Sequence, residues 1–268
     1  MNLLLRFLSA LVLLPVVVFA VLSGQIEWYG LLFLAFAATV YEYGSLIGIF
    51  GFKERVAMAL GLPLWMLGCV LCQNPFPFFI AGLGFLTFVF GAHFVFHAKL
   101  PRSDFEKMGA LLWGLMYIGA GFTSVALIRE RAGSSLVFLL LTVVWSSDTV
   151  AYFAGRCFGK HKLHASVSEK KTWEGFIGGA LGTLCMPFVI PMLFPALEWT
   201  TQEIFWVALP AIFVAPLGDL IESRLKRFYG VKDSGTILPG HGGLWDRVDA
   251  LLVMAPFVLA YAFFIQPL

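Results

Sequence analysis

Acidic side chains gather in a stretch towards the C-terminal end of the sequence, and their spacing suits a divalent cation. Asp219, Glu222 and Lys226 stand at positions i, i+3 and i+7, which places them on one face of a helix. Asp246 and Asp249 stand at i and i+3, on one face of a later helix. Mg²⁺ prefers oxygen ligands and keeps coordination positions for substrate phosphates. The two groups of acids therefore predict a magnesium site.

A glycine-rich turn and several basic residues lie between the two groups of acids. The turn, 239–243, reads Pro-Gly-His-Gly-Gly, and successive backbone N–H groups in such a turn can bind an anion. Carboxylates, cations and glycines together suit phosphoryl or nucleotidyl transfer, because this chemistry is mainly positioning and charge neutralisation. A solvated loop of paired charges would explain the cations alone, but not the acids, the histidine and the glycines as a set. The side chains that we expect to neutralise phosphate are Lys226, Arg227, Lys232 and His241.

A second polar stretch, at about 155–174, also suits phosphate. It combines glycines with Arg156, Lys170 and Lys171. Thr172 can cap the helix that follows, and the positive N-terminal end of that helix favours an anion. A loop that only marks the cytoplasmic side and attracts anionic lipid headgroups would carry similar charge. The mixture of glycine, lysine, serine and threonine favours phosphate binding.

Titratable residues also occur inside apolar segments. Asp148 lies within one, and a carboxylate in such a place usually faces a cavity, a partner or an ion. Glu42 raises the same question, but nothing near it in the sequence completes a site, so structural and functional roles stay open. His93 and His97 have the spacing of a ligand pair. Without a nearby carboxylate or cysteine, we expect these histidines to be packed or interfacial.

The elements that position these groups are expected to be membrane-spanning helices. Of 268 residues, 60% are hydrophobic and 13% are charged, whereas a soluble domain carries about 45–50% and about 25%. This composition argues against a soluble enzyme, a disordered chain and a nucleic-acid-binding domain. Helices are expected because lipid offers no partner to unpaired backbone groups. The sequence therefore predicts an all-α, polytopic membrane protein.

Nine apolar segments approach the length of about 20 residues that a membrane span needs. Sixteen of the 18 lysines and arginines fall in alternate loops, which places the N-terminus and both polar stretches in the cytoplasm. We expect an uncleaved first helix and one membrane-embedded domain, with 1–130 mainly as scaffold and 135–268 carrying the site. The expected spans are about 7–23, 26–48, 56–72, 76–97, 108–128, 135–154, 174–196, 203–221 and 245–265.

The stretch from Ser223 to Asp249 resembles the signature of the phosphatidate cytidylyltransferases, also called CDP-diacylglycerol synthases. Asp148 and parts of 151–175 are also similar to this family. One departure is Glu169, where the family usually has proline after the serine, and it adds negative charge beside the expected phosphate loop. Every fixed position of the signature is present within 27 residues: Ser223, Lys226, Arg227, Lys232, Asp233, Pro239, His241, Gly242, Gly243, Asp246, Arg247 and Asp249.

The resemblance implies an integral membrane enzyme that makes CDP-diacylglycerol and pyrophosphate from CTP and phosphatidate. It also implies Mg²⁺, a role early in phospholipid synthesis, the cell (inner) membrane and a homodimer. As metal ligands we expect Asp219 and Asp246 first, then Asp249 and Asp148. For catalysis we expect Asp219, Asp246, Lys226 and His241. The residues expected to bind substrate are Ser223, Arg227, Lys232, Asp233, Gly242, Gly243, Arg247, Arg156, Lys170, Lys171 and Thr172.

Other classes of protein stay open on the residues alone. A transporter would use Asp148 and Glu42 for ion coupling. Another lipid-phosphate transferase or kinase would share Mg²⁺ and the basic loops. A non-enzymatic scaffold would tolerate alanine at the aspartate and histidine positions.

Overall fold

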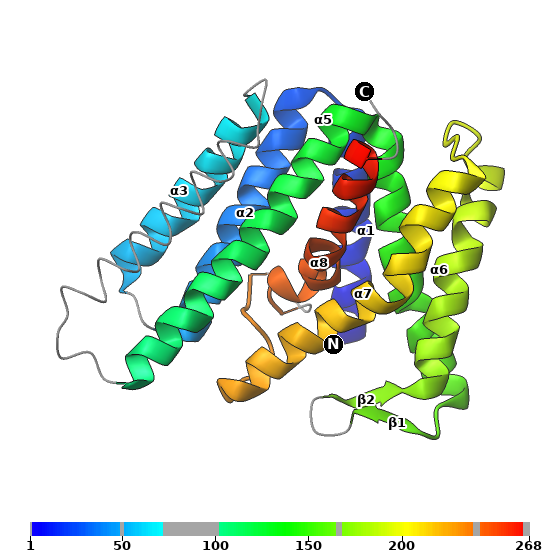
Figure 1. Cartoon of the computed structure of the whole chain (residues 1–268). Coiled ribbons are helices and arrows are strands. Elements are labelled where there is room, and N and C mark those ends of the chain that lie inside the picture. The colour runs from blue at the N-terminus through cyan, green and yellow to red at the C-terminus, as the bar shows by residue number, and fades with distance from the viewer. Residues whose placement is uncertain (1, 49–50, 72–101, 165–167, 238–241, 265–268) are drawn as a thin grey trace. The chain divides into compact units, whose positions relative to one another are not determined.

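A computed structural model describes residues 2–48, 51–71, 102–164, 168–237 and 242–264 as helices, one pair of short strands and their connections (Figure 1). The chain is a helical membrane protein, as its composition predicted. In chain order the elements are α1 (Asn2–Leu22), α2 (Gln25–Ile47), α3 (Phe52–Leu71), α5 (Arg102–Phe158), β1 (Lys162–His164), β2 (Ser168–Thr172), α6 (Trp173–Leu193), α7 (Thr201–Phe228) and α8 (Trp245–Phe264).

Eight of the nine expected membrane spans overlap these helices. The remaining one, at 76–97, lies outside the described residues, together with His93 and His97. Within the described part of the chain, four helices are long and apolar enough to cross a membrane: α2, α5 from Glu106, α6 and α7. The total number of spans stays a prediction.

α5 contains two expected spans, at 108–128 and 135–154, and its helix is interrupted between them. A straight helix of 57 residues would be about 85 Å long, whereas the bilayer core is about 30 Å thick. Gly133 has φ 80° and ψ 178°, a conformation that glycine adopts readily and that breaks the helix. α5 is therefore two helical segments joined at Gly133, which agrees with two separate spans.

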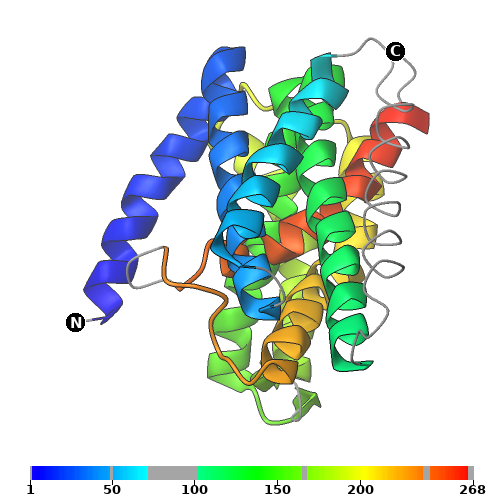
Figure 2. The ribbon, with the colours of Figure 1, turned by 90° about the vertical axis from the view of Figure 1, so that its left-hand side faces the viewer.

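The chain divides into two compact units. The first contains Met1–Ala126 and Asp233–Trp245, and the second contains Leu127–Lys232 and Asp246–Leu268. In the first unit α2 packs along α3, while α1 diverges from α2 away from the turn that joins them (Figure 2). The chain thus leaves the second unit after α7 and returns to it at the start of α8.

Aromatic side chains form much of the core of the first unit. Phe36 of α2 stacks on Phe122 of α5, with ring centroids 4.9 Å apart. Tyr43 of α2 packs edge-on against Trp245, with centroids 5.0 Å apart. The Tyr43 hydroxyl also donates a hydrogen bond of 2.5 Å to the carbonyl oxygen of Ala110. Through Tyr43, α2 therefore fixes a residue from the far end of the sequence.

The polar stretch at 155–174, expected as a loop, contains an antiparallel hairpin in the second unit. β1 and β2 pair Lys162 with Thr172 and His164 with Ser168, so the backbone groups of this stretch bond to each other. β2 runs directly into α6, and the Thr172 hydroxyl accepts a hydrogen bond of 3.1 Å from the backbone N–H of Gly175. The helix cap predicted at Thr172 is thus confirmed, and the hairpin lies at the N-terminal end of α6 (Figure 1).

A face of glycines lets α6 approach α5 closely. A Cβ atom at Gly178 would overlap the Cβ of Ala154, and one at Gly182 would lie 2.9 Å from the carbonyl oxygen of Ser146. Small residues four apart favour close helix packing in lipid, where no hydrophobic force joins the helices. This contact holds the segment of α5 that carries Asp148. The buried glycines of this face are Gly175, Gly178, Gly179 and Gly182.

Leucine at Gly178 should destabilise the protein, because the new side chain has no room beside Ala154. Overpacking of this kind costs about 1–3 kcal/mol. Gly68→Leu in α3 is a matched control, since a Cβ there meets nothing within 4 Å. Thermal unfolding in detergent, followed by intrinsic fluorescence, should show a lower midpoint for Gly178→Leu than for Gly68→Leu. Equal midpoints would contradict the packing described here.

Candidate active site

Three carboxylates from α7 and α8 converge in the second unit. One oxygen from each of Asp219, Glu222 and Asp249 lies within 4.8 Å of the other two. Glu222 and Asp249 are buried, with 2% and 7% of their surface exposed. The two helix faces predicted from the spacing of the acids therefore meet, and Glu222 is the third member of the group.

Gly218 allows α7 and α8 to come close enough for these carboxylates to meet. A Cβ atom on Gly218 would lie 2.9 Å from the Cα of Ala250 and 3.2 Å from the carbonyl oxygen of Asp249. A side chain at this position would push the two helices apart. Because Gly218 immediately precedes Asp219, its small size sets the separation between the Asp219 and Asp249 carboxylates.

Lys226 neutralises two buried acids beside this group. Its Nζ lies 2.9 Å from Glu222 Oε2, one helical turn away, and 2.5 Å from Asp246 Oδ1. The three side chains are 10%, 3% and 7% exposed for Lys226, Glu222 and Asp246, so water screens these pairs weakly. Glu222 thus belongs both to the carboxylate group and to the ion pair with Lys226.

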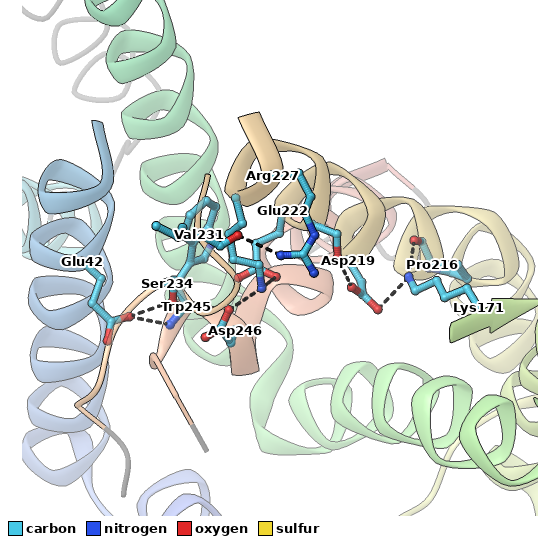
Figure 3. A network of polar contacts seen from close by, with 12 residues as sticks. Glu42, Lys171, Pro216, Asp219, Glu222, Arg227, Val231, Ser234, Trp245 and Asp246 are labelled. Carbon is cyan, nitrogen blue, oxygen red and sulfur yellow. Dashed lines mark hydrogen bonds and ion pairs between the residues drawn. The ribbon is translucent and has the colours of Figure 1, made fainter. Parts of the chain in front are cut away.

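Lys171 and Ser223 hold the remaining carboxylate, Asp219. Lys171 Nζ, from β2, lies 2.6 Å from Asp219 Oδ2 and donates a longer hydrogen bond of 3.4 Å to the carbonyl oxygen of Pro216 (Figure 3). The Ser223 hydroxyl donates to Asp219 Oδ1 at 3.2 Å. The hairpin therefore delivers a cation to the acids of α7, which links the two polar stretches of the sequence.

Asp148 of α5 joins the same electrostatic neighbourhood. It interacts with the charges of Asp219, Lys171 and Arg247, and its charge also acts on Asp249. The site thus gathers acids from three helices, which repel one another unless cations compensate their charge. The acids concerned are Asp148, Asp219, Glu222, Asp246 and Asp249.

The donor set of the carboxylate group fits a hard divalent cation. Its ligand atoms are all carboxylate oxygens, which Mg²⁺ prefers. Glu222 Oε1 is buried and has no hydrogen-bond partner among the described residues, a situation that costs about 1–3 kcal/mol. The Asp219 side chain is 36% exposed, which leaves an approach for water or phosphate. A cation bound here would give the Glu222 oxygen the partner it lacks.

Most other residues expected to bind substrate lie on exposed parts of the chain. Arg227 donates to the carbonyl oxygen of Val231 at 2.8 Å, and Arg156 donates to the Tyr152 hydroxyl at 2.9 Å. Lys170, Lys232 and Arg247 are exposed. Gly242 has φ 87°, a left-handed conformation that favours glycine. Asp233, Gly242 and Gly243 belong to the first unit, and His241 lies outside the described residues.

Glu222 is the site residue that the sequence-based ligand set omits. Its spacing from Asp219 and Lys226 placed it on the right helix face, which was the available signal. Spacing alone does not show which acids pair with lysine and which face each other across two helices. Asp246 pairs with Lys226 and is not one of the three carboxylates that meet, so its role as a metal ligand stays a prediction.

Comparisons with known proteins point in the same direction. Residues 4–265 match the sequence model of the cytidylyltransferase family. A phosphatidate cytidylyltransferase from Bacillus subtilis (strain 168) is 32% identical over 267 residues, covering 94% of this chain and 95% of the relative. Proteins of the same name from Staphylococcus saprophyticus and Staphylococcus epidermidis are 39% and 40% identical over 164 residues, or 60% of this chain. The match spans 62% of the length of these staphylococcal relatives.

Removal of the Lys226 charge should strongly destabilise the protein, because Glu222 and Asp246 would lose the cation that they share. Breaking a buried ion pair from one side costs about 3–5 kcal/mol. Lys226→Met should therefore lower the thermal midpoint in detergent, whereas Arg224→Met, at an exposed position of the same helix, should not. The double variant Lys226→Met/Glu222→Gln should recover part of the loss. Equal midpoints for Lys226→Met and Arg224→Met would show that the pairs contribute little.

Proposed function

This chain belongs to the cytidylyltransferase family, and we propose that it transfers CMP from CTP to phosphatidate, giving CDP-diacylglycerol and pyrophosphate. The observation that carries the proposal is the meeting of Asp219, Glu222 and Asp249 beside two lysines, Lys171 and Lys226. Acids that can hold a cation, next to cations that can hold phosphate, suit nucleotidyl transfer. The names of the relatives and the signature between Ser223 and Asp249 support the same reaction.

The proposed reaction is an in-line displacement at the α-phosphorus of CTP. A phosphate oxygen of phosphatidate forms the new P–O bond, and the bond from the α-phosphorus to the bridging oxygen breaks. Pyrophosphate leaves with the electron pair of that bond. The attacking phosphate is already an anion at neutral pH, so the chain does not need to supply a general base. Its residues instead bind, orient and neutralise the two anionic substrates.

Mg²⁺ is the proposed cofactor. Asp219, Glu222 and Asp249 would hold it, and Asp246 and Asp148 are further predicted ligands close to this group. When bound, Mg²⁺ would neutralise charge on the triphosphate and on the departing pyrophosphate. The unpartnered oxygen of Glu222, within the described residues, and the oxygen-only donor set support this assignment.

The basic residues divide into two groups by burial. Lys226 is nearly enclosed and holds Glu222 and Asp246 in place, so its proposed role is to keep the acids oriented. Lys171 is 23% exposed and pairs with the more open Asp219, so it can exchange this partner for a substrate phosphate. The exposed cations proposed to meet the triphosphate or the lipid phosphate are Arg227, Lys232, Arg247, Arg156 and Lys170, together with His241.

The finer membrane assignments are proposals of the same kind. We propose nine spans in the cell (inner) membrane, with the N-terminus and both polar stretches in the cytoplasm, where CTP is available. The distribution of lysine and arginine between alternate loops supports this orientation. The lipid substrate would enter sideways from the membrane, and the family resemblance supports a homodimer.

Asp246→Ala should abolish transfer while leaving membrane insertion intact. Loss of one charged group that orients the reacting phosphates should lower the rate about 100-fold or more. Purified protein is incubated with phosphatidate, radiolabelled CTP and Mg²⁺, and the label in lipid and the pyrophosphate released are measured. Glu198→Ala, at an exposed acid outside the site, is the control. Near-normal activity of Asp246→Ala would remove Asp246 from the site.

Glu222→Gln should weaken binding of the cation, because one of three charged ligands becomes neutral. Mn²⁺ can replace Mg²⁺ as a spectroscopic probe, and electron paramagnetic resonance would report bound against free ion without any turnover. We expect about tenfold weaker Mn²⁺ binding, as for loss of a supporting ligand. Glu198→Gln should bind Mn²⁺ like the unaltered protein. Equal binding in both variants would exclude Glu222 as a ligand.

A further inference from the structure

The carboxylate of Glu42 holds both ends of the segment 233–245 in the first unit. Glu42 lies on α2 and is 3% exposed. Its Oε1 accepts a hydrogen bond of 3.1 Å from the backbone N–H of Leu244. Its Oε2 accepts one of 3.0 Å from the backbone N–H of Trp245 and one of 3.4 Å from the Ser234 hydroxyl (Figure 3). A buried charge requires such bonds, and here the bonds tie a segment of the chain to α2.

Two glycines of this segment allow the backbone to wrap around the carboxylate. A Cβ atom at Gly235 would overlap the Glu42 side chain. A Cβ atom at Gly243 would lie 2.7 Å from Glu42 Oε2, and it would also overlap the Ser234 hydroxyl. The fit therefore depends on the absence of side chains at Gly235 and Gly243 as well as on hydrogen bonds.

The contacts of Glu42 fall at the first turn of α8. The first backbone N–H groups of a helix have no partner within the helix, and those of Leu244 and Trp245 are two of them. A negative charge at this end also interacts favourably with the helix dipole. Glu42 thus acts as the cap of α8, although it precedes the capped residues by 202 and 203 positions.

The residue that follows Trp245 is Asp246, the partner of Lys226. The peptide bond between Trp245 and Asp246 passes any shift at the start of α8 directly to the site. The Trp245 ring is also fully buried against Tyr43, so backbone and side chain are fixed together. Asp249 lies one turn further along α8 and depends on the same helix start.

We propose that Glu42 is a positioning residue: it fixes the first turn of α8 and thereby the orientation of Asp246 and Asp249. Its kinetic consequence rests on the proposed function of those two acids. Both Glu42 oxygens accept hydrogen bonds from backbone N–H groups, which explains a carboxylate in an apolar helix without ion coupling. Glu42 itself touches no substrate.

The test compares Glu42→Gln and Glu42→Ala with Thr39→Val. Gln keeps one acceptor oxygen, and Ala keeps none. Thr39 is a buried polar residue of the same helix whose hydroxyl bonds only locally, to the carbonyl oxygen of Ala35 at 2.8 Å. Two quantities are measured on folded protein: hydrogen–deuterium exchange of peptides covering 242–250, and kcat with KM for CTP.

A positioning role predicts faster exchange at Leu244 and Trp245 in the order Ala, Gln, unaltered protein. It also predicts a fall in kcat of about tenfold or more for Glu42→Ala, because misplaced catalytic groups slow the chemical step. KM for CTP should change by less than about twofold, since binding contacts are kept. Thr39→Val should change none of these quantities.

Unchanged exchange in Glu42→Gln and Glu42→Ala would overturn the capping contact. Faster exchange with unchanged kcat would overturn the positioning role. Unaltered protein that transfers no CMP would refute the proposed function instead, and the exchange comparison would still decide whether Glu42 holds α8.

Discussion

The site depends on the ammonium group of Lys226, which lies between two buried carboxylates. The distances of 2.9 Å to Glu222 and 2.5 Å to Asp246 leave no room for water between the charges. Acids brought together in an apolar protein repel one another, and burial makes each charge more costly. Lys226 offsets this cost for the inner acids, and Lys171 does so for the outer acid, Asp219. An added cation would complete the compensation, and anionic phosphates could then approach.

Close helix contacts bring the short side chains of aspartate within reach of one another. Gly218 sets the separation of α7 and α8 directly beside Asp219 and Asp249. The glycine face of α6 fixes the segment of α5 that carries Asp148. Glycine thus serves two needs at once, because it permits tight packing in lipid and because it places carboxylates at coordination distances. The geometry of the site is therefore a property of the helix interfaces rather than of the loops.

The sequence predicted the parts of this site that follow from local spacing. The helix faces of Asp219 and Asp249, the cap at Thr172 and the family resemblance all arise from residues close together in the chain. The helix break at Gly133 agrees with two predicted spans, but the hairpin at 162–172 was not predicted, because its strands carry no alternation of apolar residues. The choice of Glu222 for the carboxylate group depends on how α7 and α8 pack, which spacing does not determine.

Glu42 shows the same limit most clearly. Its partners lie about two hundred positions away in the sequence, and backbone N–H groups leave no mark on residue type. The glycines at 235 and 243 carried the only trace of this contact, and the sequence alone offers several other reasons for them. Long-range contacts of a single buried charge therefore needed the structure.

The central claim is that the α-phosphorus of CTP, with its nucleoside, moves to the lipid. The most direct measurement gives the purified protein phosphatidate and Mg²⁺ with CTP labelled at either the α- or the γ-phosphorus. The account predicts α-label in the lipid fraction and γ-label in pyrophosphate. Label from the γ-position in the lipid would identify a kinase. No lipid label of either kind, from folded protein, would contradict the account.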